Sequence, residues 1–384
     1  MRVIRIEGTG FEAVDYADAV GPVVRSLPYS LRVLAENVVR QDSTGDLVRH
    51  VAGRDRGAVP FRPSRLILQD MLGLPLMVDV MAMRSAVTDA GGDPSQIDLT
   101  LPVDLVIDHA MTVNHWAEKF ALTKNEAREF EINRERFAFL KACEARFPSL
   151  RVIPPGGGIM HQVNLEYLGR VVNATEAGSN LLAPDTNLGT DSHTTMINGL
   201  GILGWGIGGL EAEAIIFGES TSLNVPRVIG LEVSGSMPDE ATATDLALTV
   251  AEKLRAVGVV DCFVEVFGSG YSGLSVADRA TVANMSPEYG STCVFCPTDA
   301  NTIRFLKETG RTPEHAAMVE AYNRTQGLWV EKPDSAIDYD KVIHLALGSI
   351  RRSVAGPSRP EQRIDLDKAT GTLSLTGETG TARR

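Results

Sequence analysis

The stretch GTDSHTTMING, residues 189–199, places Asp191, Ser192 and His193 side by side between glycines. An apolar, glycine-rich run, LGILGWGIGGLEAEA (200–214), follows directly. Titratable and nucleophilic side chains next to flexible backbone are typical of a catalytic loop, but a polar turn has the same composition. Patterns elsewhere in the sequence are therefore needed to distinguish a catalytic loop from a turn.

The glycine-rich run allows three interpretations. Gly204, Gly206 and Gly209 match the GxGxxG pattern of dinucleotide-binding sites, but that motif needs a buried strand directly before its glycines, and DSHTTMING is polar. A Ser-His-Asp hydrolase is also disfavoured, because no GxSxG elbow surrounds Ser192. Glycines that allow a helix to pack tightly against a neighbour remain the preferred explanation.

Alternating strands and helices surround this stretch. Apolar runs at 102–110, 226–235 and 261–268 are typical of buried strands, and the helical periodicity of 27–41 and 241–258 predicts amphipathic helices. Such alternation favours an α/β fold with largely parallel sheets. We expect one lobe over residues 1–190, a similar lobe over 191–353, and an extended or disordered tail over 354–384, where the composition becomes polar.

Two segments carry more detailed expectations. Residues 65–87 start as an apolar strand, and we expect a break at Gly73-Leu74-Pro75 before a helix begins. Residues 124–147 are predicted to form one long charged helix.

Composition excludes several classes of protein. The chain has 384 residues, 43% of them hydrophobic, with 37 Lys and Arg against 49 Asp and Glu and a net charge of -12. This excess of acidic residues argues against nucleic acids and anionic membranes as partners. The amino terminus lacks an apolar signal region, and no apolar run reaches 18 residues. We expect a soluble cytoplasmic protein.

Histidines with nearby carboxylates mark several element boundaries. His109 follows Asp108 at the end of a predicted strand, His161 follows a Pro-Gly loop, and His193 lies two residues after Asp191. In one pocket, carboxylates could orient these imidazoles for proton transfer near neutral pH.

The four cysteines do not predict a metal site. Cys293 and Cys296 form a CxxC pair, while Cys143 and Cys262 stand alone. A structural zinc site or an iron–sulfur cluster usually takes three or four clustered ligands. We therefore interpret the pair as buried thiols and assign no residue as a metal ligand.

Ten sequence strings resemble the aconitase family, in the branch that includes bacterial aconitase A and the iron-regulatory proteins. They run from about residue 27 to residue 364 and are LPYSLRVLAENVVR, RLILQDMLGLP, VDLVIDH, NRERFAFLK, RVIPPGGGIMHQVNLEYLGRVV, GTDSHTTMINGLGILGWGIGGLEAEA, TATDLALTV, FVEVFG, LSVADRATVANMSPEYGSTCVFCPTD and GPSRPEQRI. By this resemblance, GTDSHTTMING is a catalytic and substrate-binding loop.

The resemblance implies a set of site residues. Three histidine–carboxylate pairs handle protons around the hydroxyl of a hydroxy-tricarboxylate; here they are Asp108 with His109, Asp191 with His161, and Glu288 with His193. Gln69 and Ser192 match substrate-binding positions, and Asn284 matches a residue near the cluster of the family.

Departures from the family concern its cofactor and its later domains. Family members hold a [4Fe-4S] cluster through SCTNTSN-like and GCxxC-like motifs, and neither occurs in this sequence. We therefore expect an aconitase-like fold truncated before the third and swivel domains, and no cofactor bound by this chain alone. A [4Fe-4S] cluster would need ligands from a partner.

Three functions remain open on this basis. The first is a cluster-free lyase or isomerase acting by acid–base chemistry on a small, anionic di- or tricarboxylate. The second is one subunit of a split enzyme whose partner supplies the cluster and the swivel domain. The third is a non-catalytic binding or regulatory remnant. A homo-oligomer or a partner subunit is expected, because absent outer domains would leave apolar surface uncovered.

Overall fold

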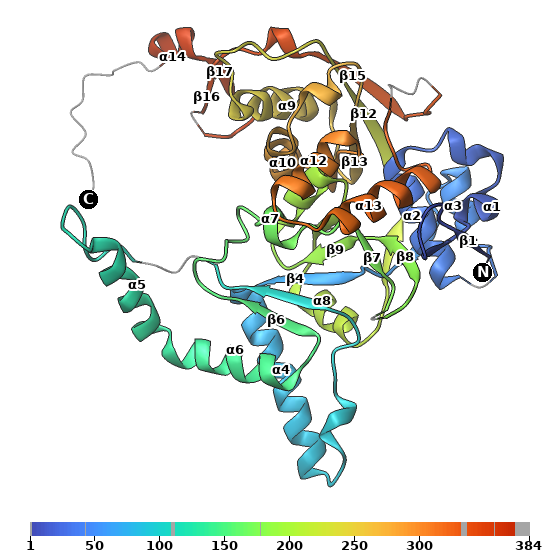
Figure 1. The fold of residues 1–384 in the computed structure, drawn as a ribbon. Helices are drawn as coiled ribbons and strands as arrows, with labels where there is room; N and C mark the ends of the chain where they lie inside the picture. Colours follow the sequence, from blue (N-terminus) through green and yellow to red (C-terminus); the bar gives the residue numbers. More distant parts are fainter. Residues whose placement is uncertain are drawn as a thin grey trace.

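The computed structural model describes residues 2–42, 44–108, 112–176, 178–331, 336–356 and 358–372. Two all-parallel sheets dominate these ranges (Figure 1). The first has the order β10 (Leu203–Gly206), β9 (Thr186–Gly189), β4 (Arg65–Gln69), β5 (Val103–Val106) and β6 (Leu150–Ile153). The second has the order β14 (Cys293–Phe295), β13 (Cys262–Phe267), β12 (Arg227–Ser234) and β15 (Lys341–Ala346). The α/β fold with largely parallel sheets is confirmed.

Smaller sheets accompany these two. A mixed sheet near the amino terminus has the order β1 (Val3–Arg5), β2 (Glu12–Val14), β8 (Leu181–Pro184) and β7 (Val172–Ala174). Two antiparallel pairs are β3 (Ala58–Phe61) with β11 (Thr221–Asn224), and β16 (Ser353–Ala355) with β17 (Arg363–Asp365). The division into lobes at residue 190 stays a prediction. Of the expected tail, residues 363–372 form β17 and α14 (Leu366–Thr372), and residues 373–384 lie outside the described ranges.

Helices connect and cover the sheets. Helices α4, α5 and α6 extend away from the first sheet, whereas α9, α10 and α12 lie beside the second (Figure 1). The helices not yet bounded are α1 (Tyr16–Val20), α2 (Tyr29–Gln41), α3 (Val48–Gly53), α4 (Asp70–Asp89), α5 (Ala121–Ile132), α6 (Arg134–Arg146), α7 (Leu165–Leu168), α8 (Gly209–Ile216), α9 (Ala243–Val257), α10 (Val276–Asn284), α11 (Ser286–Tyr289), α12 (Ala300–Glu308) and α13 (Pro313–Thr325). The helices predicted over 27–41 and 241–258 are confirmed as α2 and α9.

Two expectations about helices were wrong. No break occurs at residues 73–75: α4 starts at Asp70 and contains Pro75. The backbone hydrogen bond that Pro75 cannot make would go to the carbonyl of Met71, a residue that is 71% exposed, so water can take its place. The predicted helix over 124–147 is divided at Asn133, which lies between α5 and α6 and donates to the carbonyl of Glu129 through both its backbone amide and its side-chain amide.

Helix α4 is relevant to the question of a membrane span. By length and composition it is the one helix in the described ranges that could cross a membrane. A single helix of this kind is weak support for a membrane span, because helices of soluble proteins pass the same test.

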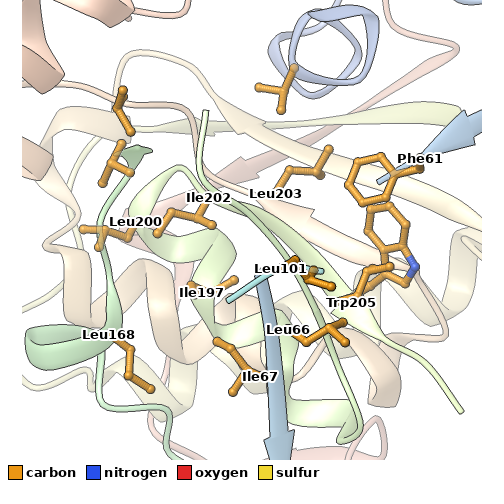
Figure 2. Close-up of a cluster of buried hydrophobic side chains, with 14 of the residues drawn as sticks. Phe61, Leu66, Ile67, Leu101, Leu168, Ile197, Leu200, Ile202, Leu203 and Trp205 are labelled. Carbon is orange, nitrogen blue, oxygen red and sulfur yellow. The ribbon is translucent and has the colours of Figure 1, made fainter. Parts of the chain in front are cut away.

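Two glycines, Gly199 directly before the glycine-rich run and Gly204 in β10 within it, lie close to neighbouring backbone. Residues 192–200 form a 3₁₀ helix, η3 (Ser192–Leu200), which lies against α10. A Cβ atom on Gly199 would come within 2.5 Å of the backbone of Ala280, and one on Gly204 within 2.6 Å of the Asn187 carbonyl oxygen. Figure 2 shows the buried side chains of η3, β4 and β10 in this region, with the ring of Trp205 beside that of Phe61 at 4.6 Å.

A buried arginine joins three strands of the first sheet. Arg65, at the start of β4, is 1% exposed. Its guanidinium lies 2.6 Å from Asp104 of β5 and 2.8 Å from Asp185, which directly precedes β9. Burial raises the pKa of Asp104 and the charges of Arg65 and Arg151 lower it, with a net lowering. The three strands are thus fixed together at the end where they begin.

A buried glutamate joins the second sheet to α2. Glu265 of β13 accepts hydrogen bonds from the backbone amides of Tyr29 and Ser30, at 3.1 and 2.8 Å. These amides belong to the first turn of α2 and have no partner within the helix. The hydroxyls of Ser30 and Tyr339 also donate to Glu265, at 2.9 and 2.8 Å. Burial raises the pKa of Glu265, and these hydrogen bonds oppose the rise.

We predict that Arg65→Met lowers the free energy of unfolding by about 3–5 kcal/mol, because it leaves Asp185 buried without its ion-pair partner and Asp104 paired with Arg151 alone. Urea unfolding followed by circular dichroism measures the change. Arg49→Met is the matched control, since the Arg49–Asp46 pair is exposed at 78% and 66% and should contribute little. Equal losses in both variants would contradict this role for Arg65.

Candidate active site

The carboxyl ends of β4, β5 and β9 carry the first part of the candidate site. Parallel strands end at the same edge of a sheet, so the residues that follow them lie together. Gln69 ends β4, and Asp108 lies two residues beyond the end of β5. The side-chain amide of Gln69 donates a hydrogen bond to Asp108 Oδ2 at 2.6 Å. The backbone amide of Gln69 donates to the hydroxyl of Thr190, directly after β9, at 3.1 Å. The strand predicted before Asp108 is present as β5, and it ends at Val106; a pocket at this edge stays a prediction.

Asp108 is held in a buried position. Its side chain is 5% exposed, and its backbone amide donates to Asp70 Oδ1 at 3.2 Å. Asp70 begins α4 and forms an ion pair with Arg136 at 2.8 Å. Burial raises the pKa of Asp70, while the Asp108 amide and Arg136 oppose the rise. The Asp108 carboxylate therefore has a fixed position from which to orient another side chain.

His161 lies between two of the strand-end carboxylates. Its Nδ1 is 3.0 Å from Asp108 Oδ2, and its Nε2 is 3.9 Å from Asp191 Oδ2. The His161 side chain is 41% exposed, so it can reach a ligand. Its ring is also 5.1 Å from the ring of His193, at an interplanar angle of 66°.

His193 is oriented from the second half of the chain. It lies in η3, and its backbone amide donates to Asp191 Oδ1 at 2.7 Å, which caps that helix. Its Nδ1 is 2.9 Å from Asn284 Oδ1, at the end of α10. The Asn284 amide nitrogen donates to the backbone carbonyl of His161 at 3.0 Å. This second bond fixes Asn284 Oδ1 as the acceptor, so the proton of His193 lies on Nδ1.

Of the three pairs that the family resemblance implied, Asp191 with His161 lies at ion-pair distance, 3.9 Å. The surroundings of the other two pairs differ from that expectation. Asp108 pairs with His161, whereas His109, its expected partner, lies outside the described residues. His193 pairs with Asn284 and not with Glu288. The physical reason is reach: Asn284 ends α10 directly against η3, while Glu288 lies one turn further, on α11.

Glu288 and Ser192 make no contact with the two histidine rings that is comparable to those of Asp108 and Asn284 among the described residues. The Oε2 of Glu288 is buried and has no hydrogen-bond partner among the residues that the structure describes. Ser192 is exposed at the first position of η3. The side-chain amide of Gln69 donates its hydrogen bond to Asp108, so Gln69 positions the Asp108 carboxylate in this structure. Binding of substrate by Gln69, Ser192 and Asn284 stays a prediction.

Three of the predicted site residues converge. One nitrogen or oxygen atom each from His161, Asp191 and His193 lies within 4.8 Å of the others. The sequence predicted these residues as proton carriers and predicted no metal ligand. Nothing in the sequence signalled the role of Asn284 as the partner of His193, because the two residues come from elements far apart in the chain.

The cysteines do not fit as ligands of an iron–sulfur cluster. All four are buried. Burial raises the pKa of the Cys143 thiol to about 11 and that of Cys296 to about 12, and it raises those of Cys262 and Cys293 as well. A cluster binds thiolates, which these surroundings disfavour.

Comparison with known proteins gives the family. The model of the aconitase family (aconitate hydratase) matches residues 38–382. The chain is 46% identical over 363 residues to aconitate hydratase A of Corynebacterium efficiens, 45% over 386 residues to that of Pseudomonas aeruginosa, and 48% over 357 residues to that of Deinococcus radiodurans.

These alignments cover 92%, 97% and 90% of this chain but 38%, 42% and 39% of the relatives. The chain therefore spans about two fifths of the length of these curated relatives. With a family match over most of its length, and with the expected strand ends in place, the chain belongs to the aconitase family.

Proposed function

We propose that this chain carries the acid–base part of an aconitase-like hydro-lyase or isomerase, acting on a small di- or tricarboxylate in the cytoplasm. The observation that supports it best is the convergence of His161, Asp191 and His193 at the strand-end edge. Asn284 is hydrogen-bonded to the ring of His193, and Asp108 lies 3.0 Å from the ring of His161. Family membership supports the reaction class, since the relatives are named aconitate hydratases.

The chemistry follows from where the protons lie. Elimination of water requires a base to take a proton from carbon and an acid to protonate the departing hydroxyl. With Nδ1 of His193 donating to Asn284, its Nε2 carries a lone pair that can exchange a proton with a substrate hydroxyl. Asp108 Oδ2 lies at ion-pair distance from Nδ1 of His161, 3.0 Å, and this contact does not by itself assign the His161 tautomer. In this proposal, Asp108 and Asn284 are positioning residues and His193 is the acid–base group.

A second candidate is a split enzyme, and a surface observation favours it. Exposed apolar side chains gather at the start of α5 and before it: Trp116 is 72% exposed, and Phe120 and Leu122 are each 65% exposed. Apolar groups clustered in this way are typical of an interface. A partner polypeptide, or a second copy of this chain, would cover them, and a partner could bring the cluster ligands that this chain does not offer.

We predict that His193→Ala lowers turnover by about a hundred- to ten-thousand-fold, the usual contribution of a general acid or base. Turnover is measured on a panel of hydroxy- and unsaturated di- and tricarboxylates, with circular dichroism as the test of folding. His50→Gln is the matched control. His50 lies outside this site and forms an exposed pair with Asp55, with 2.8 Å between Nδ1 and Oδ1. A folded His193→Ala variant as active as His50→Gln would remove His193 from the mechanism.

A second prediction concerns the cluster. Anaerobic reconstitution of the isolated chain with iron and sulfide should give no stoichiometric [4Fe-4S] cluster. In the same state, the four thiols should react slowly with iodoacetamide at about pH 8 and rapidly after unfolding, because burial holds them as thiols. About four irons per chain, lost on Cys293→Ser, would refute the cluster-free proposal.

A further inference from the structure

We propose that a cavity at the amino-terminal edge of the second sheet binds a small organic dianion through Arg56 and Arg227. The cavity has a volume of about 510 Å³, which is within the range of cavities that hold small molecules. Its lining includes none of the candidate active-site residues described above. Binding in this cavity is therefore independent of the proposed function.

The cavity lies where the antiparallel pair β3–β11 meets the second sheet. Residues 222–224 of β11 line one part of it, and Arg56 precedes β3 by two residues. Arg227 is the first residue of β12, while Asp261 and Thr292 directly precede β13 and β14. The starts of three parallel strands therefore line the other part of the cavity.

The two arginines bring positive charge that neighbouring carboxylates do not neutralise. Both residues are exposed. Within the described ranges neither guanidinium forms a salt bridge, and the carboxylate next to Arg56 in the chain, that of Asp55, lies 2.8 Å from Nδ1 of His50. In a chain with a net charge of -12, such a pair of arginines is a local positive site.

The thiol of Cys262 shows that the two guanidinium groups lie near one point. Burial raises the pKa of Cys262, Arg227 beside it opposes the rise, Asp340 adds to it, and Arg56 also opposes it. Because the field of a charge in solution is screened within about 10 Å, both arginines lie near this thiol. Asp340 itself pairs with Arg54. The two cavity arginines can thus bind one ligand together.

Two residues that line the cavity have an uncommon backbone conformation. Arg56 has a φ angle of 60° and Asp261 one of 56°, in the left-handed region that residues other than glycine rarely adopt. Residues held in this region concentrate at ligand sites. Asp261 also places a negative charge at the cavity, and this charge opposes the binding of an anion.

The lining indicates the chemistry of the ligand. A guanidinium group binds a carboxylate or a phosphate through paired hydrogen bonds. The hydroxyls of Ser222 and Thr292 and the side-chain amide of Asn224 make no hydrogen bond within the described residues, so they are available to polar groups of an organic ligand. The volume also suits an organic ligand better than a bare inorganic ion. A phosphomonoester and a dicarboxylate share this chemistry.

The test is isothermal calorimetry of the full chain at low ionic strength, with glycerol 3-phosphate and, separately, with succinate. We expect one bound probe per chain for at least one of them, and the tighter probe identifies the class of anion. Arg56→Gln and Arg227→Gln should each weaken binding at least about ten-fold, because each removes a charge-assisted hydrogen bond. Asp261→Asn should strengthen binding, because it removes a like charge.

Arg49→Gln is the matched control, since Arg49 is an exposed arginine that pairs with Asp46 elsewhere on the surface. This variant and His193→Ala should bind the probe as the unaltered chain does. Loss of binding in His193→Ala, with both cavity-arginine variants unaffected, would place the probe at the candidate active site and overturn this inference without harming the proposed function. Absence of binding by both probes, or binding that survives both Arg56→Gln and Arg227→Gln, would also overturn it.

Modification with phenylglyoxal tests the unaltered chain. The bound probe should protect Arg56 and Arg227 from the reagent but leave Arg49 as reactive as before, as read by mass spectrometry of the peptides. Equal modification of the three arginines with and without saturating probe would contradict the site.

Discussion

The salt bridges of Arg65 are the constraint on which the site depends. One guanidinium fixes the start of β4 to Asp104 of β5 and to Asp185 before β9, in a place that water does not reach. Each of these strands is only a few residues long, so a shift at its start would move its carboxyl end by the same amount. Those ends carry Gln69, Asp108 and Asp191. A buried charge network at one edge of the sheet therefore sets the geometry of a polar cluster at the other.

The cluster itself is assembled from both parts of the chain. Asp108 and Asp191 come from the first sheet, whereas Asn284 comes from α10, beside the second. Close contact between Gly199 and Ala280 brings η3 and α10 together, and this contact lets Asn284 reach both His193 and the backbone of His161. The glycine-rich run thus serves the site through packing. It needs no nucleotide to explain it.

Part of this could be predicted from the sequence, and the limit has a physical cause. The strand that ends at Asp108 and the polar loop at Asp191–His193 follow from local patterns, because burial and turn chemistry are local. The pairing of Asp108 with His161, and of His193 with Asn284, depends on how loops from different elements meet, which spacing along the chain does not encode. The break at Asn133 was missed because the helical pattern of apolar residues continues across it. The residue expected beside Asp108, His109, lies outside the described ranges.

The central claim is that Asn284 holds the proton of His193 on Nδ1 and leaves Nε2 of His193 to exchange a proton with a substrate. Two-bond proton–nitrogen correlation spectra of the chain labelled with ¹⁵N-histidine measure this directly at about pH 8.5, where an ordinary imidazole is neutral. The spectrum of His193→Gln assigns the signal. The account predicts the Nδ1–H pattern for His193. A proton on Nε2 of His193, the commoner state of a solvated histidine, would contradict it.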